Sequence, residues 1–307
     1  MILVTGGTGF IGRSLVKELL SIGKPVRLLL RPSRESPRLP RGEAVDVAVS
    51  SLRDERGLRS ALKGVDVIFH LAGVERKGSR ADLEGIDVEG SRMLASVAQR
   101  AGVDRFFYIS HLGADRSSAY PVLKAKALAE HFILDSGVGY TIFRSAPVFG
   151  RGDQFTSGLA SLLKIAPGFF LVPGDGHSLV QPIWIDDLVA CLTIALEDRD
   201  MENQVVEIGG GDYITFREVL EMIMQATGYR KLLVKIQPVY LRMLTLWLEQ
   251  TFPRYPLSMF WLDYLAADRT CPIDVLPRQF GVIPARFNQN LDYLSSRKST
   301  SLIPSQR

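Results

Sequence analysis

A run of glycines begins at residue 6, inside the opening segment MILVTGGTGFIGR. Gly7, Gly9 and Gly12 have the spacing G-x-G-x-x-G, and with Gly6 in place of Gly7 the spacing is G-x-x-G-x-x-G. The run follows a strand-like apolar stretch and opens a helical one, which is the context that this motif requires. Bare main chain and the positive end of a helix can receive a pyrophosphate there, and a Cβ atom at Gly9 would obstruct it. The sequence therefore predicts a dinucleotide site, with a plain glycine turn as the alternative.

Two arginines follow the second apolar run, VRLLLRPSR, where the adenosine ribose of a dinucleotide would lie. An acidic residue at this place would bind the 2′-hydroxyl of the ribose. Arg31 stands at the tip instead, with Arg34 nearby, and a guanidinium suits a 2′-phosphate. These residues favour NADP(H) over NAD(H), which stays an alternative, as does a solvated basic loop without a ligand.

The composition of the chain limits the other classes of function. The 307 residues carry 37 Lys and Arg against 33 Asp and Glu, a net charge of +4 that is too mild to indicate nucleic acid. Cys191 and Cys271 lie far apart, which suggests a reducing, cytoplasmic environment. The sequence has no H-E-x-x-H motif, cysteine cluster or serine elbow, so we expect no metal site and no hydrolase. No apolar stretch is long enough to span a bilayer, and MILV suits a first strand better than a signal peptide.

Apolar runs alternate with helical periodicity through the first half of the chain. The expected strands are ILVT (2–5), VRLLL (26–30), VDVAV (45–49), VDVIFHLA (65–72), RFFYIS (105–110) and YTIFR (140–144). The expected helices cover 10–22, 53–63, 87–101 and 122–135. Continuous apolar runs are typical of parallel strands that helices cover on both faces. The pattern predicts an α/β fold with a Rossmann-like, doubly wound parallel sheet over residues 1–150.

The second half is less regular and predicts a smaller α/β lobe over residues 151–294. Residues 150–180 are rich in loop signals, and strands are expected near 183–185 and 205–208, interleaved with the sheet. The serine-rich, basic residues 295–307 are expected to form a disordered tail.

Several polar residues have structural interpretations. A helix is expected to begin at Asp186 or Asp187, with the acid as its cap. Asp153, in GRGDQF, is expected to form a turn or bind in a loop, and His70 to be a buried histidine satisfied by the backbone. A further capping box and helix end are expected at Thr215, Glu218 and Gly228.

Residues 238–265, PVYLRMLTLWLEQTFPRYPLSMFWLDYL, are unusually apolar. In the first part of this segment, Arg242, Thr245 and Glu249 share one narrow stripe, and apolar side chains cover the rest. Packing between layers or lobes is the favoured interpretation, and contact with a membrane surface or a partner protein is the alternative.

Motifs along nearly the whole chain resemble those of the atypical short-chain dehydrogenase/reductases, which are epimerase/dehydratase-like. They are VTGGTGFIG, ALKGVDVIFHLAG, YISHLGAD, FRSAPVFGRGDQF, LVQPIWIDDLV, VVEIGGGDYITFREVLEMI and PIDVLPRQFGVIPARFNQNLDYL. The subgroup that they resemble most contains the nucleotide-binding accessory subunit of respiratory complex I and its bacterial relatives. The resemblance implies a Rossmann-like lobe that holds NADP(H) and a smaller C-terminal lobe that closes over the nicotinamide end.

The resemblance also implies roles for individual residues. The pyrophosphate turn would consist of Gly6, Gly7, Thr8, Gly9, Phe10, Ile11 and Gly12. Arg31 would bind the 2′-phosphate, and Ser110 would lie near the nicotinamide. The adenine-side ribose and pyrophosphate would contact Leu71, Ala72 and Gly73. Many relatives have Gly-Asp-Leu after the third strand, where the Asp contacts adenine; this chain has Ser50, Ser51 and Leu52, so that contact is weakened or changed.

Short-chain dehydrogenases carry a Tyr and a Lys four residues apart on one helix, so that the ammonium lowers the pKa of the phenol and holds the ribose. Tyr120 and Lys124 have this spacing. However, the family's lysine is followed four residues later by Glu, a pattern that Lys126 reproduces and Lys124 does not. If Lys126 is the equivalent lysine, Val122 stands at the tyrosine position, and Pro121 predicts that the helix begins after Tyr120.

The favoured arrangement is therefore a cofactor-holding Lys126 without a catalytic phenol. The alternatives are a working Tyr120/Lys124 dyad, assisted by Ser110, and lysines on an ordinary solvated helix face. A cofactor-holding Lys126 without a catalytic phenol favours a protein that holds NADPH for a structural, assembly or redox-sensing role. This role would be near a membrane complex, at the inner face of the membrane. The dyad instead predicts an NADP-dependent reductase, dehydrogenase or epimerase acting on a small lipophilic substrate in the cleft between the lobes.

Overall fold

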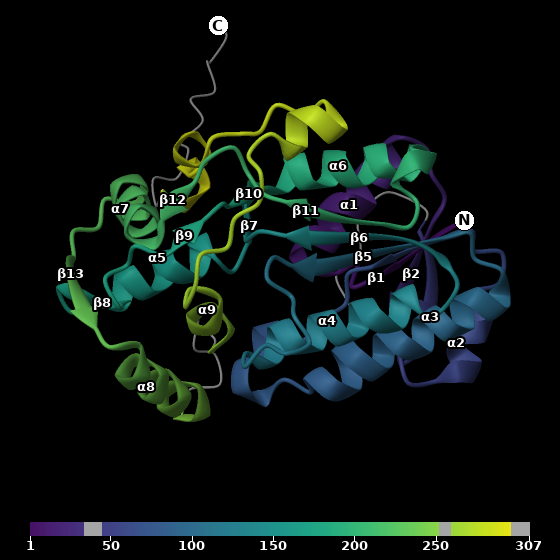
Figure 1. The fold of residues 1–307 in the computed structure, drawn as a ribbon, viewed down its shortest axis with the longest axis horizontal. Coiled ribbons are helices and arrows are strands. Elements are labelled where there is room, and N and C mark those ends of the chain that lie inside the picture. The colour runs from purple at the N-terminus through teal and green to yellow at the C-terminus, as the bar shows by residue number, and fades with distance from the viewer. Residues whose placement is uncertain (34–44, 252–258, 296–307) are drawn as a thin grey trace, which may run out of the picture.

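The computed structural model describes residues 1–33, 45–251 and 259–295, and a seven-stranded parallel sheet lies at its centre (Figure 1). The order of the strands is β11-β6-β5-β4-β1-β2-β3. Their bounds are β1 Ile2–Thr5, β2 Val26–Leu30, β3 Asp46–Val49, β4 Val67–His70, β5 Arg105–His111, β6 Gly139–Ser145 and β11 Gln204–Ile208. β1 pairs with β2 on one side and with β4 on the other, so the order of the strands reverses at β1. A reversal of this kind opens a crevice at the carboxyl ends of the strands, where α/β proteins bind ligands.

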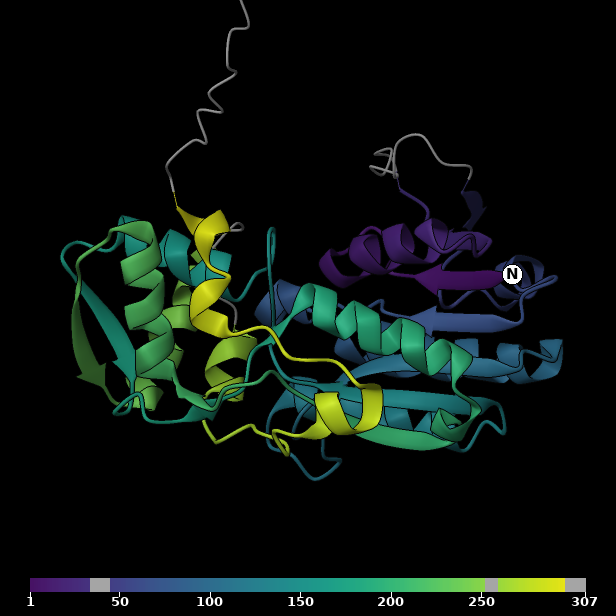
Figure 2. The same cartoon turned by 90° about the horizontal axis from the view of Figure 1, so that it is seen from above.

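Helices cover both faces of the sheet (Figures 1 and 2). One face carries α1 (Phe10–Ser21) and α6 (Ile185–Glu197), and the other carries α2 (Glu55–Ala61), α3 (Glu89–Ala101) and α4 (Pro121–Leu134). Successive residues of a strand point to opposite faces, so Val4 of β1 joins the core under α1 and α6, and Leu3 joins the core under α2, α3 and α4. All four residues of β1 are buried, which is why the strand needs a continuous apolar run. The predicted doubly wound sheet is confirmed.

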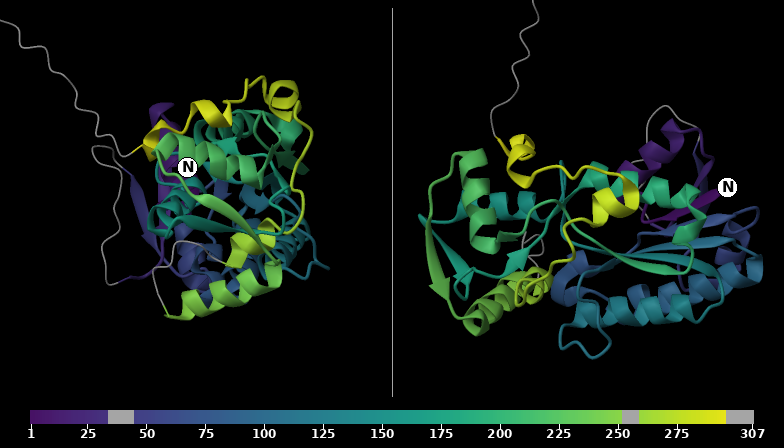
Figure 3. Two further views of the ribbon diagram at one scale, coloured as in Figure 1. Left: turned by 90° about the vertical axis from the view of Figure 1, so that its left-hand side faces the viewer. Right: turned by 45° about the horizontal axis from the view of Figure 1, so that its top comes forward.

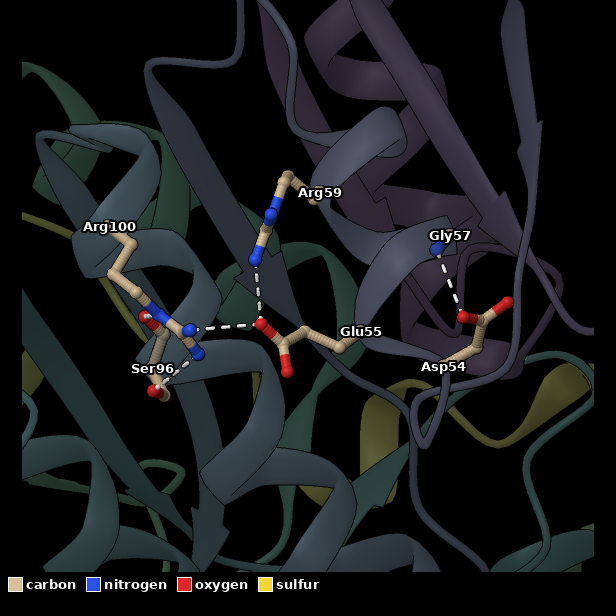
Figure 4. A network of polar contacts seen from close by, with 6 residues as sticks. All are labelled: Asp54, Glu55, Gly57, Arg59, Ser96 and Arg100. Carbon is tan, nitrogen blue, oxygen red and sulfur yellow. Dashed lines mark hydrogen bonds and ion pairs between the residues drawn. The ribbon is translucent and has the colours of Figure 1, made fainter.

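Helices α2 and α3 are also joined by a polar network on their outer side (Figure 4). One oxygen of Glu55 accepts from Arg59 on the same helix at 2.8 Å and from Arg100 of α3 at 2.9 Å. Asp54 caps α2 by accepting from the amide of Gly57 at 3.1 Å. The network joins two of the helices that cover this face of the sheet.

Among the residues that the structure describes, the second lobe contains three small two-stranded sheets and four α-helices. Figure 3 shows the lobe from two further sides. The strand pairs are β7 (Val148–Phe149) with β10 (Ile183–Trp184), β9 (Leu179–Val180) with β12 (Ile214–Thr215), and β8 (Phe169–Pro173) with β13 (Leu232–Ile236). The helices are α5 (Thr156–Ile165), α7 (Phe216–Thr227), α8 (Pro238–Thr251) and α9 (Met259–Tyr264). Short 3-10 or π helices are Glu75–Arg80, Leu83–Val88, Arg199–Met201, Leu276–Phe280, Phe287–Gln289 and Asp292–Leu294. Strand β11 returns to the edge of the main sheet, so the second half of the chain contributes to both lobes.

The structure corrects two expectations about the second half and confirms two others. Residues 150–180 are not mainly loop, because α5 and β8 lie there; Asp153 forms the turn, as predicted, and binds the amides of Thr156 and Ser157, which start α5. Helix α6 begins at Ile185, before either aspartate, and Asp187 is no cap, because its carboxylate accepts from the amide of Ala285 at 2.8 Å. The predicted capping box and the left-handed glycine at the start and end of α7 are confirmed.

The favoured interpretation buried the apolar face of helix α8 between layers or lobes, and the structure shows the opposite orientation. Its buried residues are Leu241, Thr245 and Glu249, so the polar stripe faces the protein. Most of the exposed side chains are apolar, namely Val239, Tyr240, Met243, Leu244 and Trp247, and the polar Gln250 and Thr251 are exposed at the end of the helix. The inward orientation has a physical reason, because Glu249 accepts from the amides of Ser79 and Met259, and Arg242 pairs with Asp263 at 2.6 Å.

None of the helices in the described ranges is long and apolar enough to cross a membrane. Arg34 and the tail over 296–307 fall outside these ranges.

Candidate dinucleotide site and adjoining cavity

The glycine turn lies at the carboxyl end of β1 and leads directly into α1. Gly6 has a φ of +70°, and a Cβ atom on it would lie 2.7 Å from the main chain of Leu71 and Ala72. A Cβ atom on Gly12 would lie 2.3 Å from the carbonyl oxygen of Gly6, so this glycine lets the helix pack on the turn. A Cβ atom on Gly9 would meet only the Gly6 oxygen within 4 Å, at 3.1 Å. The side of the turn at Gly9 is therefore open to a ligand.

The first turn of α1 supplies donors for an anion. Its first intrahelical bond runs from the amide of Arg13 to the carbonyl of Gly9 at 3.0 Å, so the amides of Phe10, Ile11 and Gly12 precede it. Such amides have no partner within the helix, and together with the helix dipole they suit a phosphate. Thr8 lies exposed beside them.

The loop after β4 forms the other wall of this crevice. The amide of Leu71 donates to the carbonyl of Thr5 at 3.2 Å, and the amide of Ala72 donates to the hydroxyl of Thr5 at 3.3 Å. Gly73 follows, and a Cβ atom on it would lie 2.3 Å from a carboxylate oxygen of Glu75. Leu71, Ala72 and Gly73 therefore lie against the glycine turn, where a pyrophosphate would bind.

A buried chain of hydrogen bonds supports both walls. The hydroxyl of Ser91 donates to the carbonyl of Asp87 at 2.5 Å, so it can only accept from Nε2 of His70, at 2.9 Å. Nδ1 of His70 then accepts from the hydroxyl of Thr5 at 2.6 Å. His70 is thus satisfied by two side chains, and the expectation that the backbone satisfies it is wrong. Burial, and next the charge of Lys126, lower the pKa of His70 to about 3, which agrees with this neutral tautomer.

The neutral state of His70 predicts a loss of stability in acid. The unfolded chain takes up a proton near pH 6.5, whereas His70 in the folded protein does not until about pH 3. The free energy of unfolding should therefore fall by about 1.4 kcal/mol per pH unit for this residue as the pH drops below 6.5. His111, with a pKa lowered to about 4, adds a similar slope.

Urea unfolding between pH 6.5 and 5 measures this slope. We expect His70→Gln to remove about half of it. His177→Gln is the control for a histidine substitution, because the side chain of His177 is exposed and lies outside the buried network of His70. An unchanged slope in His70→Gln would show that this residue is charged in the folded protein.

One of the two predicted arginines, Arg31, lies at the carboxyl end of β2. Arg31 follows β2 directly and is exposed. The neighbouring Arg27 has a structural role, because its guanidinium pairs with Asp46 at 2.6 Å and donates to the carbonyls of Ala61 and Lys63. Of the two predicted arginines, Arg31 and Arg34, only Arg31 falls within the described ranges, and it lies at the carboxyl end of β2.

The end of β3 carries the predicted adenine-side residues. Ser50 is buried, and its amide continues the pairing with β2 by donating to the carbonyl of Leu30 at 2.9 Å. Ser51 accepts from the amide of Arg53 at 3.2 Å. Leu52 is partly buried against the core under α2 and α3. The segment presents a hydroxyl and an apolar surface at this end of the sheet.

The two lysines of α4 differ sharply in their surroundings. Helix α4 begins at Pro121 with Tyr120 as its N-cap, which confirms that Tyr120 precedes the first turn. Lys124 is exposed. Lys126 is buried, and its ammonium lies 3.2 Å from Asp87 and 4.0 Å from Glu75. Val122, one turn before Lys126, is also buried.

Burial and charge oppose each other around Lys126. Burial alone would lower the pKa of Lys126, but Tyr108, Glu75 and Asp87 together raise it above its ordinary value. Burial raises the pKa of Asp87, and Lys126 partly offsets this effect. The ammonium and the carboxylates thus form one interacting group of charges behind Gly73.

The end of β5 divides its side chains between two environments. Ser110 is fully buried, and its hydroxyl has no hydrogen-bond partner in the part of the chain that the structure describes. By strand alternation it shares the face of Tyr108, over whose ring Lys126 lies at 5.4 Å. Ile109 and His111 point the other way and line a cavity.

This cavity, of about 80 Å³, lies between the two lobes. Phe10 and Ile11 of the glycine turn form one wall. The second lobe contributes aromatic side chains, which are Phe155, Phe260, Trp261 and Tyr264. The cavity is therefore continuous with the dinucleotide turn and mostly apolar.

Sequence reasoning did not single out His111, Tyr264, Asp87 or Glu75. A signal for His111 existed, because it follows Ser110 at the end of an expected strand. Asp87 and Glu75 carried none, since their role depends on how the loop after β4 folds over α4. Within residues 1–33, 45–251 and 259–295, no group of three or more His, Cys, Asp or Glu side chains is placed to hold a metal ion.

Comparison with known proteins agrees with this geometry. Residues 6–152 match a family model described as NAD(P)H-binding. The chain is 31% identical over 227 residues to the mitochondrial NADH dehydrogenase [ubiquinone] 1 alpha subcomplex subunit 9 of Arabidopsis thaliana, covering 72% of this chain and 56% of the plant protein. It thus spans little more than half of that relative's length. It is also 31% identical over 262 residues to Sterol demethylase protein B of Methylococcus capsulatus, covering 77% of each chain.

Solved structures share the fold. The UDP-glucuronic acid 4-epimerase of Bacillus cereus, in complex with UDP-glucuronic acid and NAD, superposes with a TM-score of 0.71 at 18% identity. The match covers 95% of this chain and 98% of the epimerase. The first half of this chain is therefore an NAD(P)-binding domain.

Proposed function

The chain belongs to the atypical short-chain dehydrogenase/reductase family, and on that premise we propose that it retains NADP(H) in a structural, assembly or redox-sensing role at the inner face of a membrane, beside a membrane complex. The observation that carries this proposal is the outward apolar face of α8. The similarity to the Arabidopsis relative supports it, because that protein's name makes it a subunit of a mitochondrial NADH dehydrogenase that uses ubiquinone.

Two features of the site favour retention of the cofactor over its turnover. Lys126 is buried at the edge of the crevice and can hold a ribose, but Val122 stands where the family's phenol would be. Tyr120 lies before the first turn of α4, and Lys124 points to solvent. The bound dinucleotide supplies hydride chemistry, and these residues of the chain position it without an evident proton donor on α4.

The preference for NADP(H) rests on Arg31. It is exposed at the carboxyl end of β2, beside the glycine turn, and has the charge that a 2′-phosphate needs. The residue directly after β2, where an acid would bind a bare ribose hydroxyl, is an arginine in this sequence.

The apolar face of α8 suits the interfacial region of a bilayer. Helix α8 lies at the outer side of the second lobe, away from the main sheet (Figures 1 and 3). Tyr240, Met243 and Trp247 are each about 60% exposed, at 61%, 64% and 59%. A helix that keeps its polar stripe inside and shows Tyr, Trp and Met outside leaves a surface that water solvates poorly. Leu232 of β13 and Phe169 of β8, also exposed, belong to the sheet that precedes and contacts α8.

Vesicle flotation tests this surface. The 307-residue protein should float with vesicles of phosphatidylcholine and phosphatidylglycerol. Met243→Ser with Trp247→Ser should weaken binding by at least about 100-fold, because each buried side chain of this size contributes about 1.5–3 kcal/mol. Ile283→Ser is the control, since Ile283 is 88% exposed in a loop far from α8. Equal flotation of the double variant and the wild type would contradict the proposal that the outward face of α8 binds a membrane.

A second candidate function is reduction of a lipophilic carbonyl compound, and the apolar cavity beside the glycine turn favours it. The name of the Methylococcus relative, which refers to sterols, supports the same class of substrate. An added substrate should then oxidise bound NADPH, seen as loss of the absorbance of the reduced nicotinamide. Retention of NADPH without oxidation favours the first proposal.

A further inference from the structure

Two buried polar atoms without a hydrogen-bond partner belong to side chains that line the cavity between the lobes. They are Nε2 of His111 and the hydroxyl oxygen of Tyr264, and neither has a partner among the described residues. Tyr264 is only 1% exposed. Because an unsatisfied buried polar group costs about 1–3 kcal/mol, two of them beside one cavity point to a ligand that supplies their partner.

Both groups are neutral at pH 7, which restricts the ligand. Burial raises the pKa of Tyr264, so its hydroxyl is a hydrogen-bond donor. Burial, and next the charge of Lys126, lower the pKa of His111 to about 4, so its imidazole can donate or accept according to its tautomer. Neutral partners in an apolar wall suit an uncharged oxygen better than a carboxylate or phosphate.

The two groups come from different lobes. His111 ends β5 of the main sheet, and Tyr264 ends α9 of the second lobe. Their ring centroids are 6.3 Å apart, and the ring of Phe260 lies 4.9 Å from that of His111. The side chains of Phe155, Trp261 and Phe260 complete the aromatic wall, with Glu75 and Gln154 as further polar members of the lining.

The volume of the cavity limits the size of the group that enters. It measures about 80 Å³, and one water needs about 10–15 Å³ on this scale. The space therefore takes a head group near the size of one six-membered ring, and a longer apolar tail would extend toward the cavity mouth.

We propose that this cavity binds the carbonyl head of an apolar molecule, with the Tyr264 hydroxyl donating a hydrogen bond to the carbonyl oxygen and His111 making the second polar contact. The inference deepens the second candidate function by naming the two residues that would hold the carbonyl oxygen, and rests on that candidate only for the chemistry that follows binding. The binding step itself involves no transfer of electrons.

Paired probes test the proposal on the full-length protein, with and without NADPH. The ketone 4-methylcyclohexanone and the hydrocarbon methylcyclohexane have the same ring and differ in the oxygen. Saturation-transfer NMR should show the ketone binding about tenfold more tightly, which corresponds to one net hydrogen bond. The infrared carbonyl stretch of the bound ketone should lie below that of the ketone held in an apolar solvent.

Tyr264→Phe should abolish the preference for the ketone and return the carbonyl stretch toward its position in the apolar solvent. It removes an unsatisfied hydroxyl, so the ligand-free variant should unfold at a temperature no lower than the wild type. Tyr213→Phe is the matched control, because the hydroxyl of Tyr213 already donates to the carbonyl of Cys271 at 2.7 Å, and it should keep the preference.

Equal binding of ketone and hydrocarbon by the wild type would overturn the proposal, as would a carbonyl stretch that Tyr264→Phe leaves unchanged. The fluorescence of NADPH, titrated in the same samples, reports the cofactor separately. Ketone binding without NADPH uptake would contradict the proposed function and would still support the carbonyl site.

Discussion

Gly9→Ala is expected to leave the fold intact and to weaken NADPH binding by at least about 100-fold. The new Cβ atom would lie 3.1 Å from the Gly6 oxygen, so the turn must give by only a few tenths of an ångström. On its open side, however, the methyl group would block the approach of a pyrophosphate to the first amides of α1. Losing two hydrogen bonds to a charged group costs about 1.5–3 kcal/mol each, which accounts for the expected factor.

Titration calorimetry measures the loss of binding, and thermal unfolding measures the fold. Glu18→Ala is the control, because Glu18 is exposed near the far end of the same helix, away from the glycine turn, and should keep its affinity. Gly12→Ala should behave differently from both, since its Cβ atom would lie 2.3 Å from the Gly6 oxygen and 2.7 Å from Gly7 Cα. That variant should lose stability as well as binding. If Gly9→Ala binds NADPH as tightly as the wild type, the phosphates do not lie at this turn.

Lys126→Met is expected to destabilise the folded protein by about 3–5 kcal/mol at pH 7. The substitution leaves Asp87, which is 1% exposed, without the ammonium at 3.2 Å. The pKa of Asp87 is already raised by burial, and removing Lys126 raises it further. A raised carboxyl pKa means stability that is present at low pH and lost as the pH rises, so the difference from the wild type should shrink as the pH falls toward 4.

Two variants separate this effect from a general loss of packing. Lys124→Met, two residues away on the exposed side of α4, should change stability little. Adding Asp87→Asn to Lys126→Met removes the unpaired charge and should recover most of the loss. If Lys126→Met and Lys124→Met unfold at the same urea concentration, Lys126 is not the counter-ion of the buried carboxylates.

The main sheet could be predicted from the sequence because its signals are local. Each parallel strand needs an apolar run, and each covering helix needs its own apolar stripe, as Val4, Leu3 and Leu15 show. The start of α4 at Pro121 and the ends of α7 also follow from single residues. Residues 150–180 were harder, since glycines and prolines flank the short helix α5 and hide its apolar spacing.

The orientation of α8 could not be predicted from its own sequence. An apolar face is normally buried, and here Arg242 and Glu249 find partners in other segments, Asp263 and the amides of Ser79 and Met259. The same limit applies to the site. The glycine spacing and Arg31 are visible in the sequence, whereas the group around Lys126 depends on the path of the loop that carries Glu75 and Asp87. The pairing of His111 with Tyr264 depends on how the two lobes meet.

Native mass spectrometry of the purified full-length protein tests the central claim most directly. If the glycine turn retains a dinucleotide and Arg31 selects it, the folded protein should carry one equivalent of NADP(H), which appears as free cofactor after denaturation. NAD(H) in its place would contradict the role of Arg31. The absence of any dinucleotide, together with no uptake of either coenzyme in solution, would contradict the account as a whole.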